Sequence, residues 1–249
     1  MSEKAVETMN KVCIIVGHGK SKSGGYDSGA VSGIYHEFKI AKEIAKECVD
    51  YLNANFDIKA DLMNYDGDLY LTERVAKVNK ADYDFIAEIH LNAGGGTGTE
   101  TYYYHGSERA RNFADKISKE ISSALGIKQR PSYGDDAKKD KDKDGGDKTK
   151  LGNNGKDYFA IIRDTKPTAV LVETVFIDTA SDLAKVKNKD GQNACGVAIA
   201  KGIARAYGIA PEEKKTYRVY VGDFNTTSSA EAMKNGLEKL GFDAKIEEV

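Results

Sequence analysis

Three short apolar runs constrain this chain more than any other feature of its 249 residues. They cover residues 11–17 (KVCIIVG), 84–91 (DFIAEIHL) and 169–177 (AVLVETVFI). Near-continuous runs of this length are typical of strands that are buried on both faces of a sheet. None of them approaches the ~20 apolar residues that a membrane-spanning helix needs. We therefore expect a buried sheet and no insertion into a membrane.

The segments between these runs indicate helices and further strands. Apolar residues recur at helical spacing over residues 35–53. We also expect the following elements: helices at 71–79, 107–125, from 180 onward and at 193–207, and strands at 58–63 and 99–104. Alternation of strands and helices predicts an α/β fold, with a twisted, mostly parallel sheet flanked by helices.

The C-terminal part has a pattern of its own. We expect a catalytic-size domain at residues 10–208, a linker at 209–216 and a small β-α-β segment at 217–249. The last segment reads as a strand at 217–221, a helix at 228–240 and a strand at 243–248. A piece this short is poorly suited to folding as an independent domain.

A polar segment at residues 134–157 interrupts the alternation. Most of it reads KKDKDKDGGDKTKLGNNGKD, which offers almost nothing apolar to bury. We expect a mobile surface loop here, and the sequence leaves open whether it borders a substrate groove.

Charge and cysteine content exclude several classes of protein. Lysine and arginine number 37 against 39 aspartate and glutamate residues, so no positive excess favours nucleic acid as a partner. Cys13, Cys48 and Cys195 are odd in number and widely spaced, which argues against a disulfide scaffold. Each lies in an apolar or helical stretch, so we expect buried, reduced thiols.

Polar residues gather where the predicted strands end. His18 follows the first strand, His90 ends the 84–91 strand, and Glu37 opens the helix after the His18 loop. Ligand sites form outside the carboxyl ends of parallel strands, so these side chains should share one crevice. Two histidines and one carboxylate are the ligand set of catalytic zinc sites that keep a position open for water.

Glu173 is a carboxylate within an otherwise apolar strand. Burying an unpaired charge is costly, so this residue should either be paired or lie at the mouth of the strand. It is free to take a proton from zinc-bound water and to return it to a leaving amine. His36 and His105 are weaker candidates, because a helical neighbour of Glu37 does not share its face and His105 follows a strand.

Six segments in order resemble the zinc-dependent N-acetylmuramoyl-L-alanine amidases of the amidase-3 family. They are IIVGHGKSKSGGYDSGA, Glu37, LTERVAKVN, IAEIHLNAG, GTETYYY and PTAVLVETVFIDTASD, and they span roughly residues 12–207. The resemblance implies a twisted, mainly parallel sheet. It also implies His18, Glu37 and His90 as ligands of Zn²⁺ and Glu173 as the catalytic residue. The implied reaction is hydrolysis of the amide between N-acetylmuramic acid and L-alanine in bacterial peptidoglycan, leading to lysis of the wall.

Four further residues are candidates for a supporting or substrate role. Glu88 stands where the family usually has a small residue, and it either orients a ligand histidine or pairs with a cation elsewhere. Asn92 belongs to the H-x-N-A segment, and Arg74 precedes an apolar element. Arg163 is either a structural ion-pair partner or a clamp for a substrate carboxylate.

The segment 217–249 resembles one half of a SPOR-type glycan-binding module. A single half would leave strand edges open, so we expect two chains to pair their tails into a complete module. The N-terminal residues show no signal peptide, which fits a phage endolysin that stays in the cytoplasm until the membrane is breached. Two alternatives remain at this point: a zinc exopeptidase of related fold, and a non-catalytic protein that binds the cell wall.

Overall fold

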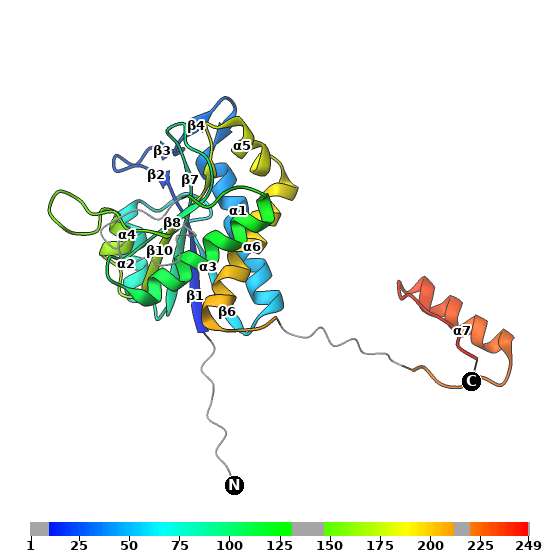
Figure 1. Ribbon diagram of the computed structural model, residues 1–249. Helices are drawn as coiled ribbons and strands as arrows, with labels where there is room; N and C mark the ends of the chain where they lie inside the picture. Colours follow the sequence, from blue (N-terminus) through cyan, green and yellow to red (C-terminus); the bar gives the residue numbers. More distant parts are fainter. Residues whose placement is uncertain (1–9, 131–146, 212–219, 249) are drawn as a thin grey trace, which may run out of the picture. The chain divides into compact units, whose positions relative to one another are not determined.

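The computed structural model describes residues 10–130, 147–211 and 220–248 (Figure 1). The chain divides into two compact units, Met1–Glu212 and Glu213–Val249. None of the helices in the described ranges is long and apolar enough to cross a membrane.

A six-stranded sheet in the order β6-β1-β7-β10-β8-β9 forms the centre of the first unit. Its strands are β1 (Asn10–Val16), β6 (Ile58–Met63), β7 (Phe85–Asn92), β8 (Glu100–Tyr103), β9 (Asp147–Lys148) and β10 (Thr168–Phe176). The first four strands in this order run parallel, β8 runs antiparallel to β10, and β9 runs parallel to β8. The predicted mostly parallel sheet is confirmed.

Helices cover both faces of this sheet, as the α/β pattern predicts (Figure 1). They are α1 (Glu37–Asn55), α2 (Leu71–Lys80), α3 (Glu108–Leu125), α4 (Ala160–Arg163), α5 (Ala180–Val186) and α6 (Lys189–Tyr207). Helices α1, α3 and α6 pack on one face of the sheet and form the larger apolar core with it. Helices α2 and α4 pack on the opposite face of the sheet and form a smaller core.

Strand β1 shows why the apolar runs are continuous. Val12, Ile14 and Val16 belong to the larger core, and Cys13 and Ile15 between them belong to the smaller one. All five side chains are completely buried. Since successive residues of a strand point to opposite faces, a strand covered on both sides must be apolar at every position.

The three cysteines are buried and free, as predicted. Burial disfavours the thiolate and raises the pKa of Cys13 and of Cys195 to about 12. The pKa of Cys48 is raised for the same reason. These thiols therefore serve as small apolar side chains.

Part of the charged segment packs against the sheet, contrary to the expectation of a mobile loop over 134–157. Residues 131–146 lie outside the described residues, but β9 pairs with β8, and Lys148, Thr149 and Asp157 are buried. Lys148 forms an ion pair with Glu100 on β8. The buried carboxylate of Glu100 is stable only with a cation beside it. Lys148 supplies this cation, so the segment packs against the sheet although it offers few apolar side chains.

The second unit contains helix α7 (Thr227–Lys239), close to the predicted helix at 228–240. The structure does not describe residues 212–216 of the predicted linker or residues 217–219 of the first predicted strand. The strand expected at 243–248 is wrong for the described chain, because these residues form no regular element. A strand needs a hydrogen-bonding neighbour, and the described part of this unit offers none.

Small hairpins precede α1 and shape the loop after β1. They pair β2 (Gly19–Lys20) with β3 (Tyr26–Asp27), and β4 (Val31–Ser32) with β5 (Tyr35–His36). The second hairpin leads directly into the first turn of α1 at Glu37. The chain thereby returns to the sheet edge at which β1 ends.

Candidate functional site

The carboxyl ends of β1, β7 and β10 meet at one edge of the sheet. His18 follows β1 by two residues, His90 lies near the end of β7, and Glu173 pairs with His90 in register on β10. All three line one cavity of about 510 Å³, together with Glu37. The crevice expected at the ends of parallel strands is present.

His18 is held in an unusual backbone conformation. Its φ of 62° lies in the left-handed region, which is uncommon for residues other than glycine. The side-chain amide of Asn64 donates to the carbonyl oxygens of Val16 at 2.7 Å and of His18 at 2.8 Å. Arg74 also donates to the His18 carbonyl, at 3.1 Å. These contacts fix the tight turn that directs the imidazole into the cavity.

Glu37 lies at the first position of α1 and is buried. Its carboxylate accepts hydrogen bonds from the backbone N–H of Ala30 at 2.8 Å and of Leu91 at 3.0 Å. One oxygen thus binds the loop before α1 and the other binds β7. The carboxylate is held in place before any ligand binds.

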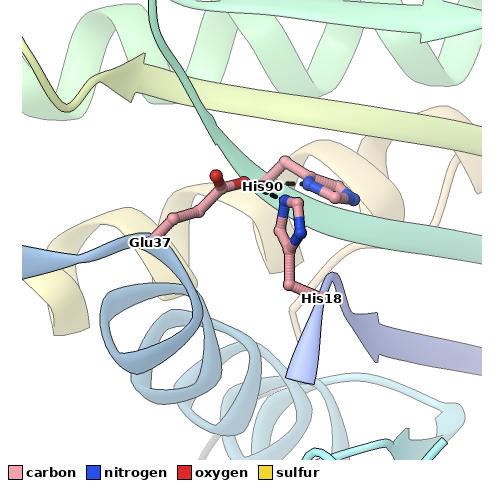
Figure 2. Close-up of side chains that lie close together, drawn as sticks. All are labelled: His18, Glu37 and His90. Atoms are coloured by element: carbon pink, nitrogen blue, oxygen red, sulfur yellow. Dashed lines mark hydrogen bonds and ion pairs between the residues drawn. The ribbon is translucent and has the colours of Figure 1, made fainter. Parts of the chain in front are cut away.

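His18, Glu37 and His90 converge as predicted (Figure 2). Nε2 of His18 lies 3.1 Å, and Nδ1 of His90 lies 2.9 Å, from the same oxygen, Oε1 of Glu37. One ligand atom from each residue lies within 4.8 Å of the others. Two imidazole nitrogens and a carboxylate oxygen suit a divalent transition metal such as zinc.

Two glycines leave room for these side chains. A Cβ atom at Gly17 would lie 2.3 Å from the His90 ring. A Cβ atom at Gly29 would lie 2.6 Å from Oε2 of Glu37 and 2.7 Å from Cδ2 of His18. The backbone therefore forms a cradle that fits the ligand set closely.

Each histidine has a second carboxylate on its other ring nitrogen. Asp27 lies 3.0 Å from Nδ1 of His18, and Glu88 lies 3.2 Å from Nε2 of His90. Glu88 also pairs with Arg74, with 2.8 Å between Nε and Oε1. The sequence left open whether Glu88 contacts a ligand histidine or a cation, and in the structure it contacts both. Asp27 was missed from the sequence, because its short strand lies in a loop without a periodic signal.

The ionisation of the group follows from these contacts. Burial disfavours the charged form of Glu37, but hydrogen bonds from His18 and His90 outweigh it and lower the pKa of this carboxyl. Burial likewise opposes the charge of Glu88, and Arg74 and His90 reverse the effect and lower its pKa. Both carboxylates are therefore ionised at neutral pH, as ligands and orienting groups of a cation must be.

Glu173 differs from these two carboxylates. Its Oε2 atom is buried and has no hydrogen-bond partner among the described residues. Burial raises the pKa of Glu173 to about 7. A carboxyl that is poised near neutrality and faces a cavity has the properties of a general base or acid.

Apolar side chains form another part of the cavity wall, on the sheet face that α2 and α4 cover. They include Leu71 from α2, Leu171 from β10, and Phe159, Ala160 and Ile161 at the start of α4. The cavity thus has a polar part with the histidines and carboxylates and an apolar part formed by α2, α4 and β10. A substrate with both amide and methyl groups would find complementary surfaces here.

The other sequence candidates lie at different places. Asn92 and Arg74 line the cavity, whereas Arg163 lines a separate one and pairs with Asp164 at 2.8 Å. Arg163 also donates to the carbonyl oxygen of Asp157. These contacts are those of a structural ion-pair partner, the first of the two roles that the sequence left open for Arg163. His36 and His105 do not belong to the metal-ligating group.

Comparisons with known proteins agree with this geometry. A family model described as N-acetylmuramoyl-L-alanine amidase matches residues 12–205. The chain is 27% identical over 241 residues to N-acetylmuramoyl-L-alanine amidase CwlM of Bacillus licheniformis, covering 96% of this chain and 85% of that protein. It is 30% identical over 219 residues to an endolysin of Bacillus phage SPP1, covering 80% of this chain and 73% of that one.

A solved structure is similar to most of the chain. The catalytic domain of CwlV, an N-acetylmuramoyl-L-alanine amidase from Bacillus (Paenibacillus) polymyxa, is 28% identical in sequence. The match has a TM-score of 0.62 and covers 81% of this chain and all of that domain.

Proposed function

The chain belongs to the amidase-3 family of N-acetylmuramoyl-L-alanine amidases, and we propose that the ion held by His18, Glu37 and His90 is zinc. The chain hydrolyses the amide bond between N-acetylmuramic acid and L-alanine in peptidoglycan, and the exopeptidase and non-catalytic alternatives are set aside. The convergence of the three ligand atoms on one point carries the proposal. Two imidazoles and one carboxylate are a ligand set that zinc accepts while an open position remains.

The residues around the ion have separate tasks. A zinc ion bound here supplies a Lewis acid for the amide carbonyl and lowers the pKa of water. Glu173 removes a proton from the attacking water and transfers it to the alanine nitrogen as the C–N bond breaks. Asp27 and Glu88 hold the second nitrogen of each histidine, which fixes the ring orientation. Arg74 compensates the charge of Glu88.

Replacement of Glu173 tests its role. Glu173→Gln keeps the shape of the side chain and removes proton transfer, so activity should fall about 10²–10⁴-fold while bound metal is unchanged. Activity is measured as the appearance of free L-alanine amino termini on purified peptidoglycan, and metal by elemental analysis. Full activity in a fully metal-loaded Glu173→Gln protein would contradict the assignment.

The identity of the ion is tested separately. The protein is stripped with a chelator and then reloaded with zinc, manganese, cobalt or magnesium. We expect activity to vanish on stripping and to return with zinc at one equivalent per chain. Recovery with magnesium but not with zinc would contradict the zinc proposal.

The tail is proposed to act as a pair. Apolar side chains of the second unit are exposed, with Tyr220 at 80%, Leu240 at 75% and Phe242 at 62%. Two tails that pair would cover these side chains and complete the SPOR-like module that binds the wall glycan. In ultracentrifugation the full chain should sediment as a dimer, and a chain that ends at Ala210 as a monomer. A full chain that stays monomeric at micromolar concentration would contradict the pairing.

Similarity to a phage endolysin supports a setting for the activity. We propose that the protein accumulates in the cytoplasm and reaches the wall only after the membrane is breached. Cultures that express it should keep their turbidity until chloroform is added and then lyse. Lysis without chloroform, or enzyme in the medium of intact cells, would contradict this setting.

A further inference from the structure

A further buried carboxylate, Glu100 on β8, has four polar partners beside the catalytic cavity. Oε1 accepts hydrogen bonds from the amide of Asn92 at 2.7 Å and from the hydroxyl of Tyr102 at 3.0 Å. Oε2 forms ion pairs with Arg130, at 2.6 Å, and with Lys148. The side chain is only 3% exposed. A carboxylate buried this deeply is stable only because its partners satisfy it.

The position of Glu100 places this cluster next to the reaction. In the antiparallel pairing of β8 with β10, Glu100 lies directly opposite Glu173. Directly opposed residues of an antiparallel pair project to the same face, so the two carboxylates are neighbours. The cations Arg130 and Lys148 offset part of the charge of Glu100, and the charge that remains contributes, after burial, to the raised pKa of Glu173.

Asn92 connects this cluster to the cavity. It lies two residues after the ligand His90, and it lines the cavity. Its side-chain oxygen accepts from the backbone N–H of Ala93 at 2.8 Å, and one N–H of its amide donates to Glu100. The second N–H of the amide has no partner among the described residues. Both ends of the carboxamide are thus fixed while one donor stays available.

We propose that Glu100 is a positioning residue that holds Asn92 so that its second N–H donates to a backbone carbonyl of the stem peptide. The inference rests on the amidase function given above and adds a specificity-determining contact to it. Asn92 would bind the peptide equally in the ground state and the transition state, since the contact does not involve the atoms that react. Such uniform binding lowers KM and leaves kcat unchanged.

The experiment compares Glu100→Gln, Asn92→Ala and the double variant on a soluble muramyl-peptide fragment. The Glu100→Gln variant would present an amide to Arg130 and Lys148 and would lose the charge that orients Asn92. We expect each single variant to raise KM about 10-fold with kcat within threefold of the unaltered enzyme, about the effect of one neutral hydrogen bond. The double variant should match Asn92→Ala alone, because Glu100 acts through Asn92.

A matched control lies at the next position. Thr101 is buried and bonds to Ser118 at 2.8 Å on the face opposite Glu100. Thr101→Val should change the melting temperature but neither kcat nor KM. Metal content is measured for every variant, so that loss of the ion is recognised.

Three results would overturn the inference. Losses of Glu100→Gln and Asn92→Ala that multiply in the double variant would mean that the residues act independently. A fall in kcat alone would mean that Glu100 acts on Glu173 instead. Unchanged KM in Asn92→Ala would overturn it even if Glu100→Gln failed to fold. An unaltered enzyme without amidase activity would instead contradict the proposed function.

Discussion

Buried side chains fill both faces of the sheet in the first unit, whereas α7 in the second unit has no buried residue. In the first unit the apolar residues of β1, β7 and β10 are buried between the sheet and its helices. In the second unit the apolar residues have no such layer in the described chain. The difference shows why a precise site forms at the sheet edge, because side chains are fixed only where the backbone beneath them is held by a core.

The largest effect on activity is expected at Gly17, next to β1, where the packed backbone of the first unit holds the site in place. Gly17→Ala would place a Cβ atom 2.3 Å from the His90 ring and push it away from Glu37. A ligand displaced by about 1 Å should cost about 10²-fold in activity. Activity and bound metal are measured together.

Gly25→Ala is the control for this change. A Cβ atom there would have only the Ser21 hydroxyl within reach, at 3.6 Å. We expect this variant to keep its metal and its activity. Equal behaviour of the two variants would show that the site tolerates movement and that the comparison is wrong.

The next effect concerns stability. Ile117 on α3 is completely buried, and Met233 on α7 is 39% exposed. Ile117→Ala should lower the free energy of unfolding by about 2–5 kcal/mol, since it leaves a cavity in the core. Met233→Ala should change it by no more than about 0.5 kcal/mol. Denaturant unfolding measures both, and a large loss in Met233→Ala at a concentration where the chain is monomeric would contradict the contrast.

The smallest effect compares two helix caps whose side chains accept a hydrogen bond at the same distance. Ser107 accepts from the backbone N–H of Ala110, and Thr226 from that of Ser229, both at 3.2 Å. Replacement of either cap by alanine should cost about 1 kcal/mol of helix stability. Ser107→Ala should lower the melting temperature of the first unit, whereas Thr226→Ala should only speed hydrogen exchange in α7. A shift of the main melting transition by Thr226→Ala would show that the two units unfold together.

The elements that carry a periodic signal could be predicted from the sequence. The apolar runs and the spacing rules for parallel sheets identify the strand ends, and His18, His90 and Glu173 follow from them. Glu37 follows because a helix after the first strand returns to the same edge. These residues meet because the topology places all of them at the same edge of the sheet.

Contacts between loops could not be predicted in this way. The pairing of Asp27 with His18 depends on a hairpin without periodicity, and the burial of Lys148 depends on a carboxylate 48 residues earlier in the chain. Composition alone indicates that a segment is polar and does not say which of its charges has a buried partner. The strand expected at 243–248 failed for a related reason, since alternation along one segment does not supply the neighbour that a strand requires.

The strand order has a consequence for the synthesis of the chain on the ribosome. Strand β10 lies between β7 and β8, although both of these are synthesised before it. A nascent chain that stops short of residue 168 already carries the three proposed ion ligands, His18, Glu37 and His90, but lacks Glu173, the proposed proton-transferring carboxylate. The proposed reaction centre therefore has all of its residues only after a strand that comes late in synthesis is made, and that strand lies between two strands made before it.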